Sequence, residues 1–208
     1  MQVLNMRHKT SKNIFTYWNN LRGARVAPER TEIEPSDIRD MLGDTFILEV
    51  DHLYRTISFR LAGTKLCSSY GRELKSVGYL GLWDETDNLR IFDAVKQVYE
   101  HAIPTVIAHI AETENRHFLE YETLLLPLLN GSSKTVRILG VAAPSEVPSW
   151  MGMDPIINNR VKSVRTVDIT SVVQTPSLAP DLSNNFKMPN NAPRKVAHLT
   201  VFDGGLEN

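Results

Sequence analysis

The sequence has one cysteine, Cys67, which excludes an intramolecular disulfide and any metal site built from several cysteines. It has no run of about 18 apolar residues, the length that a membrane-spanning helix needs. Residues 1–13 lack the apolar segment of a signal peptide. These absences predict a protein of a reducing compartment, the cytoplasm, without a membrane span.

Neither sign of charge predominates, because 23 basic residues face 24 acidic ones. This balance argues against a general nucleic-acid-binding or anionic-membrane surface and leaves room only for a local basic patch. The phosphate-binding loop G-x-x-x-x-G-K-[ST], the nucleophile motif G-x-S-x-G and the zinc motif H-E-x-x-H are also missing. We therefore expect no nucleic-acid partner, no metal and no recognisable catalytic residue.

Alternation of apolar and polar residues predicts strands. In residues 54–62, for example, Ile57, Phe59 and Leu61 fall on one face of the strand. The same signal gives five strands in all: 45–51, 54–62, 105–111, 118–128 and 136–143. Apolar residues at helical spacing predict a long helix over 84–101 and shorter helices over 11–22, 35–43 and 65–70.

This order, two strands, helices and then three strands, predicts an α+β fold. We expect a five-stranded antiparallel sheet with helices on one face. Residues 1–43 form an N-terminal helical segment and residues 44–144 the core. Residues 145–208 form an extension rich in proline, serine and asparagine, with two strand-like islands at 161–169 and 196–202. The islands pair with each other, extend the sheet or pair with another chain.

Two motifs in the core match a known family. They are Arg60-Leu61-Ala62-Gly63-Thr64 and Gly71-Arg72-Glu73-Leu74. With the element order, the segment from Pro28 to Leu48 and the closing residues 194–205, the chain resembles the alphaproteobacterial family of PAS domains called PAS_5. The resemblance covers residues 14–144 and that tail. It implies a PAS fold in which Arg60, Gly63, Gly71 and Arg72 are signature positions, and a cytosolic, non-catalytic regulatory protein.

A PAS fold encloses a cavity between its sheet and its helices, and five residues are candidates to line it: Trp83, His109, Tyr121, Phe59 and Cys67. Each is equally explained as a core residue. Light-sensing PAS relatives place their reactive cysteine in an Asn-Cys-Arg-Phe-Leu-Gln-like run. Here Leu66 precedes Cys67 and Ser68 follows it, so we expect no flavin and no other cofactor.

Three arginines, Arg22, Arg25 and Arg30, cluster before the first strand and are candidates for binding an anion such as a phosphate. Salt bridges to the nearby acidic residues Glu32, Glu34 and Asp37 explain them equally well.

These observations favour a sensory or regulatory protein that acts through a protein partner and forms a homodimer, with or without a small ligand in its cavity. Two alternatives stay open. The first is a small enzyme that uses Glu122, His109 or Tyr121 as an acid or base. The second is a structural adaptor that binds no ligand.

Overall fold

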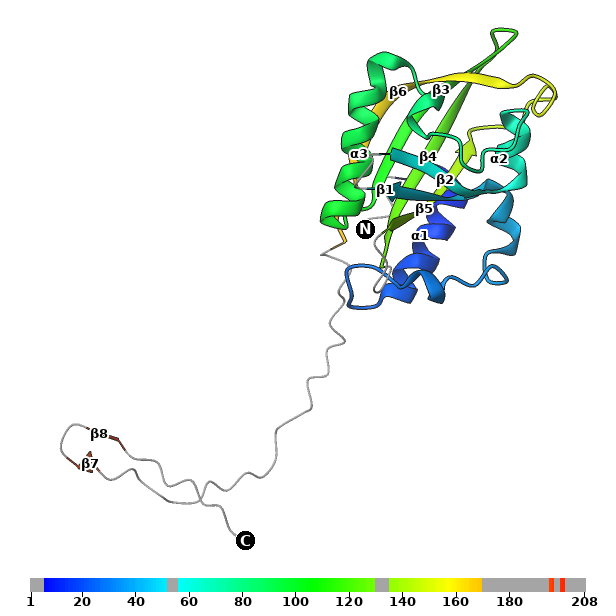
Figure 1. The fold of residues 1–208 in the computed structure, drawn as a ribbon. Helices are drawn as coiled ribbons and strands as arrows, with labels where there is room; N and C mark the ends of the chain where they lie inside the picture. The colour runs from blue at the N-terminus through cyan, green and yellow to red at the C-terminus, as the bar shows by residue number, and fades with distance from the viewer. Residues whose placement is uncertain (1–5, 52–55, 130–134, 170–194, 197–198, 201–208) are drawn as a thin grey trace. The chain divides into compact units, whose positions relative to one another are not determined.

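The computed structural model describes residues 6–51, 56–129, 135–169, 195–196 and 199–200 (Figure 1). The chain divides into two units, Met1–Val173 and Gln174–Asn208. In the second unit, strands β7 (Lys195–Val196) and β8 (Leu199–Thr200) pair antiparallel. They fall at the predicted island over 196–202, whose other residues lie outside the described ones. No helix in the described part of the chain is long and apolar enough to cross a membrane.

The first unit is built on one antiparallel sheet of six strands in the order β2-β1-β5-β4-β3-β6. The strands are β1 (Thr45–Asp51), β2 (Thr56–Ala62), β3 (Thr105–Thr113), β4 (Phe118–Leu128), β5 (Val136–Pro144) and β6 (Ile156–Thr166). The predicted α+β fold class is confirmed. The sheet has six strands rather than five, because β6 pairs with β3 along its edge.

The expected strand-like island over 161–169 overlaps the second half of β6, and its pairing with β3 is the one of the three expected roles in which it extends the sheet. Residues 156–160 were expected to lie in the extension without strand structure. The polar sequence of β6, IINNRVKSVRT, lacks the apolar alternation of a half-buried strand. Such a composition suits an edge strand, one side of which faces solvent. The division into domains at residues 43 and 144 stays a prediction, but the sheet itself continues past residue 144.

The helices are α1 (Lys9–Arg22), α2 (Thr64–Ser69) and α3 (Asn88–His101), with four 3-10 turns: η2 (Arg30–Glu32), η3 (Arg39–Asp44), η4 (Leu80–Leu82) and η5 (Glu85–Asp87). The helix expected over 35–43 is therefore only a 3-10 turn. The first helix begins at Lys9, two residues earlier than expected, and His8 caps it: His8 Nδ1 accepts a hydrogen bond from the Thr10 amide at 3.1 Å.

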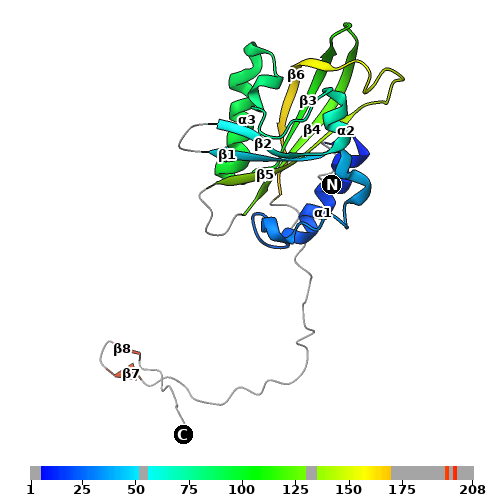
Figure 2. The ribbon, with the colours of Figure 1, turned by 45° about the vertical axis from the view of Figure 1, so that its right-hand side comes forward.

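Helices cover both faces of the sheet (Figures 1 and 2). Helices α2 and α3 pack on one face, in a core that includes Leu119, Tyr121 and Leu125 of β4. Helix α1 packs on the opposite face with the alternate residues Leu124 and Leu126. On that side the indole Nε1 of Trp18 donates to the Pro127 carbonyl at 2.8 Å. The N-terminal helix thus completes a second core.

The pairing of β1 with β2 contains a bulge. Ile47 pairs with Leu61 and Leu48 pairs with Phe59, so Arg60 has no partner in the register. A bulge reverses the face of the residues that follow it. The prediction that Leu61 shares a face with Ile57 and Phe59 is therefore wrong: those two are buried, whereas Leu61 is 56% exposed.

We predict that Gly140→Ala destabilises the sheet. A Cβ at Gly140 in β5 would lie 2.1 Å from two ring atoms of Phe46, so the ring would have to move within a packed core. The expected loss in the free energy of unfolding is about 3 kcal/mol, measured by urea denaturation. The control is Gly81→Ala, whose Cβ would meet nothing within 4 Å. Equal stability of the two variants would show that Phe46 does not need the space.

Candidate functional site

A small hollow of about 20 Å³ lies in the core between the sheet and the α2–α3 layer. That volume suits about one water molecule. Its walls come from β1, β2, β3, β4, β5, α2 and the turns before α3. The lining residues are Phe46, Phe59, Leu66, Tyr70, Tyr79, Leu82, Trp83, His109, Tyr121, Thr123 and Ala142.

Four of the five pocket candidates line this hollow together: Phe59, Trp83, His109 and Tyr121. The fifth, Cys67, does not. It is buried on α2, where its Sγ lies 3.9 Å from both the Ala62 carbonyl and the Glu73 carboxylate. Whether the four bind anything stays a prediction.

The β3–β4 hairpin brings His109 and Tyr121 together, because its register pairs them directly. This register is centred on Asn115, in the turn between the two strands. It also places Thr123 two residues further along the same face of β4. Thr123 was missed, although the hairpin register points to it.

His109 is buried between two aromatic rings. Its ring centroid lies 4.8 Å from that of Trp83 and 5.5 Å from that of Tyr121, and its Nε2 lies 3.0 Å from Thr123 Oγ1. Burial lowers the pKa of His109 to about 3, against a smaller opposing effect of Asn159. The imidazole is therefore neutral at physiological pH, with one ring nitrogen a donor and the other an acceptor.

Several polar atoms in and beside the hollow lack a hydrogen bond of normal geometry to any described residue. They are Tyr79 Oη, Trp83 Nε1, His109 Nδ1 and Asn159 Oδ1. Burial also raises the pKa of Tyr79, so its hydroxyl stays protonated. A buried donor or acceptor without a partner costs about 1–3 kcal/mol. Donors and acceptors together thus surround a space too small for a large apolar group.

Asn159 comes from β6 and was not predicted as a site residue, because it lies in a polar run outside the predicted core. Its Nδ2 donates to Tyr70 Oη at 2.9 Å and to the Leu82 carbonyl at 2.7 Å. The Asn159 carbonyl accepts from the Asp84 amide at 2.9 Å. Strand β6 thereby contacts the turn that leads into α3.

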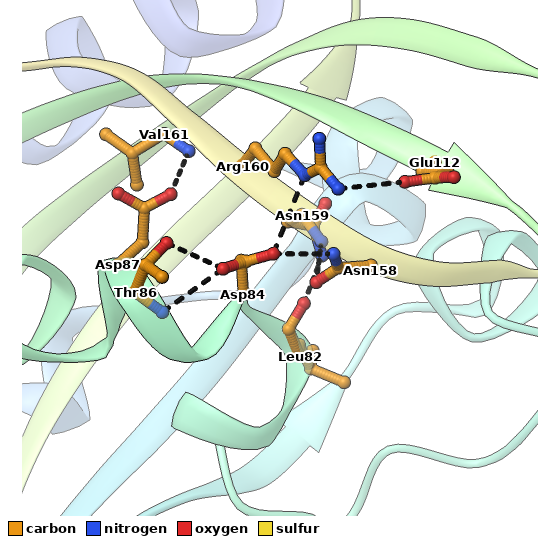
Figure 3. A network of polar contacts seen from close by, with 9 residues as sticks. All are labelled: Leu82, Asp84, Thr86, Asp87, Glu112, Asn158, Asn159, Arg160 and Val161. Carbon is orange, nitrogen blue, oxygen red and sulfur yellow. Dashed lines mark hydrogen bonds and ion pairs between the residues drawn. The ribbon is translucent and has the colours of Figure 1, made fainter.

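Figure 3 shows how this turn holds the edge of β6. Asp87 Oδ2 accepts from the Val161 amide at 2.8 Å, and Arg160 lies within ion-pair distance of Asp84 and Glu112 (3.5 and 3.8 Å). These contacts occupy backbone groups of an edge strand that would otherwise be available to another chain. They also link β3, β6 and the start of α3.

Of the three residues proposed as acid or base for an enzyme, His109 and Tyr121 lie together in the hollow, and Glu122 lies apart from them. Tyr121 faces the hollow, where its hydroxyl donates to Ser69 Oγ at 3.3 Å. Glu122 is the next residue and points to the opposite face of β4. There its carboxylate accepts from the backbone amides of Arg7 and His8 at 2.7 and 3.0 Å. Glu122 therefore holds the N-terminal segment and does not reach His109.

The three arginine candidates for anion binding separate. Arg22 is buried, with its guanidinium 5.5 Å from the ring centre of Trp18, and it donates to Asn19 and to the carbonyls of Arg25 and Ile169. Arg25 forms a two-pronged salt bridge with Glu32, at 2.8 and 2.9 Å. Arg30 lies elsewhere, beside another hollow on the sheet.

The signature positions have local roles. A side chain on Gly63 would lie 2.1 Å from the Leu42 carbonyl oxygen, so the backbone approaches too closely for a Cβ. Gly71 has φ +61°, in the left-handed region that favours glycine. Arg60 and Arg72 are exposed. The part of the chain that the structure describes holds no group of three or more side chains arranged to bind a metal ion.

We predict that His109 makes stability depend on pH. Its pKa is about 3 in the folded protein and near the ordinary 6.5 in the unfolded chain. As the pH falls below 6.5 the unfolded chain takes up the proton first, so stability is present above that pH and is lost toward pH 3. Between pH 7 and pH 5 the loss due to this group is about 2 kcal/mol.

The His109→Gln variant should lack this part of the pH dependence in urea unfolding at the two pH values. His101→Gln, at an exposed position at the end of α3, is the matched control and should keep it. If the free energy of unfolding of His109→Gln still falls between pH 7 and pH 5 as much as that of the wild type, the histidine is not held neutral.

The model of a PAS domain family matches residues 6–143. A search of curated proteins finds no match. Among solved structures, the PAS domain of a protein from Colwellia psychrerythraea is 15% identical, with 53% of this chain and 97% of that chain covered and a TM-score of 0.37.

A sensory box histidine kinase/response regulator from Burkholderia thailandensis is 14% identical, over 54% of this chain and 85% of that chain, with a TM-score of 0.35. A light-oxygen-voltage domain studied with a flavin analogue is 13% identical, over 53% and 83%, with a TM-score of 0.40. All three TM-scores are below 0.5, so the assignment depends on the family match. The narrower alphaproteobacterial assignment stays a prediction. Because that match covers more than half of the sequence, the chain belongs to the PAS domain family.

Proposed function

We propose that this chain is a non-catalytic, cytoplasmic PAS regulator that acts by contacting another protein, and that its core hollow holds a small polar molecule. Membership of the PAS family supports a sensory or regulatory role. The observation that carries the ligand is a set of buried polar atoms on Tyr79, Trp83, His109 and Asn159 that lack a hydrogen bond of normal geometry among the described residues. Trp83 lies close enough to Tyr79, and Asn159 to His109, to affect the pKa of that neighbour, but neither pair forms a well-aligned bond. A bound molecule with both donors and acceptors would satisfy them.

The size of the hollow limits the ligand to a few atoms, since about 20 Å³ is far below the roughly 300 Å³ at which sites for drug-sized ligands begin. Its binding would change the hydrogen bonding of residues on β3, on β6 and before α3 at once. A shift in the packing of these elements can alter the surface that a partner contacts.

The enzyme alternative has less support. A general acid or base must lie within hydrogen-bond reach of the reacting group, in a site that usually combines more than one such residue. Here the carboxylate of Glu122 and the imidazole of His109 project from opposite faces of the sheet. The adaptor alternative differs from our proposal in having no ligand, and one measurement separates them.

That measurement is native mass spectrometry of the full chain purified from its own host, followed by denaturing analysis of what is released. We expect a stoichiometric small polar molecule. Thr123→Val should reduce its retention, because it keeps the shape of the wall and removes a hydroxyl. The matched control is Thr45→Val, a buried threonine that does not line the hollow. A wild-type protein of bare mass would favour the ligand-free adaptor.

Exposed apolar residues at one end of the sheet support a protein contact. Phe118 of β4 pairs with Glu112 of β3, which in turn pairs with Asn158 of β6, next to Ile157. The side chains of Phe118 and Ile157 are 61% and 59% exposed. The two residues come from the strands on either side of β3, and exposed apolar side chains can supply the hydrophobic part of an interaction site. We propose that a second copy of the chain binds here.

Light scattering of the full chain should therefore report a dimer, and Phe118→Asn should shift it toward the monomer at equal concentration. Leu89→Asn is the control, because Leu89 is 72% exposed on α3, away from this end of the sheet. A monomeric wild type, or the same shift in both variants, would contradict dimerisation through Phe118.

A further inference from the structure

A second hollow, of about 340 Å³, lies where β1, β2 and β5 meet the segments before β1 and after α2. Its lining consists of four basic residues and two aliphatic ones: Arg30, Arg60, Lys75, Arg137, Ile47 and Leu61. The chain as a whole has a net charge of −1. A hollow whose charged lining residues are all basic is therefore a local feature, not a consequence of composition.

The four basic residues come from four separate parts of the sequence, and backbone contacts hold each of these parts in place. The bulge in β2 leaves Arg60 unpaired and sets Leu61 beside Ile47. The Arg30 amide donates to the Leu129 carbonyl, just after β4, at 3.0 Å.

Arg137 pairs with Glu49 across β5 and β1. Lys75 is fixed by its neighbour Ser76, whose amide donates to the Phe59 carbonyl at 2.7 Å. Main-chain pairing and hydrogen bonds thus fix the backbone from which the four cationic side chains project.

Most of this positive charge is not neutralised. The side chains of Arg30, Arg60 and Lys75 have no hydrogen bond or ion pair with any residue in the described ranges. Arg137 has one acidic neighbour, Glu49, at 3.6 Å from its Nε, without a hydrogen bond. By contrast, Arg25 and Lys65 elsewhere are each paired with a carboxylate at less than 3 Å. Like charges gathered in a concavity repel one another and attract an anion.

We propose that this hollow binds a small molecule bearing two or more phosphate groups. Arginine side chains bind phosphate oxygens through paired N–H donors, and a lysine adds a point charge. The aliphatic floor of Ile47 and Leu61 offers contact to the part of the ligand that carries no charge, which accounts for the exposure of Leu61. The volume falls within the usual range for small-molecule sites, about 300–1,000 Å³.

A concave site favours a compact anion over an extended acidic segment of a partner protein, which would need a basic strip. The site lies on the α1 side of the sheet, because Ile47 belongs to the core on that side, whereas the small hollow lies on the α2–α3 side. The inference is therefore independent of the ligand proposed for the core.

The test is isothermal titration calorimetry of the full chain with inorganic pyrophosphate and with ATP, at low salt and at high salt. We expect both to bind, with an affinity that falls as salt rises. Arg60→Gln and Arg137→Gln should each weaken binding by about tenfold, the loss expected for one charged hydrogen bond. Arg39→Gln is the matched control: Arg39 is exposed, has no ion pair among the described residues and lies outside the hollow.

Equal urea midpoints of the variants would show that folding is intact. Failure of pyrophosphate and ATP to bind at millimolar concentration in low salt would overturn the proposal. An equal loss in Arg39→Gln would do the same, since it would indicate diffuse charge attraction. Binding of a poly-glutamate peptide without binding of pyrophosphate would also overturn it, in favour of an acidic partner segment.

Discussion

The burial of β4 on both of its faces is the constraint on which the rest of the structure depends. Every residue from Tyr121 to Leu128 is buried, because α3 and its neighbours cover one face of the sheet and α1 covers the other. A strand shielded on both faces can be apolar on both, and its residues alternate between two separate cores. Polar groups on the two faces are thereby kept apart: Tyr121 faces the small hollow, whereas the neighbouring Glu122 binds the amides of Arg7 and His8 on the other face.

The small hollow depends on contacts that close the sheet on its β6 side. Asn159 hydrogen-bonds two residues that line it, Tyr70 and Leu82, and the turn before α3 holds the backbone of β6 at Asp84 and Asp87. A polar edge strand buries little apolar area, so its stability depends on these hydrogen bonds. In the inner strands, burial of apolar side chains has that role. The same hydrogen bonds connect the residues around the hollow with the start of α3.

The two hollows lie on opposite faces, yet neighbouring residues of the same strands line them. In β1, Phe46 faces the small hollow and Ile47 the basic one. In β2, Phe59 faces the small hollow, and the bulge at Arg60 directs the next residues to the other side. A displacement of β1 or β2 at one hollow therefore reaches the other without an intervening element.

Alternation and helical spacing in the sequence determined most of the elements. The predicted bounds 45–51 and 118–128 are those of β1 and β4, and the long helix was recognised from its apolar stripe. Local patterns suffice there because each element buries a regular face. The pairing of His109 with Tyr121 was not predicted, although both were named as candidates for the same cavity.

Only the tertiary structure decided the remainder. It showed that a polar segment forms β6 and that a bulge turns Leu61 outward. It also showed that Arg30 lines a hollow with Arg60, Lys75 and Arg137, and not with Arg22 and Arg25, its neighbours in the sequence. Each of these features depends on hydrogen bonds between residues far apart in the chain. No local periodicity encodes such pairing, because the partner that satisfies a backbone amide is chosen only when the whole sheet is assembled.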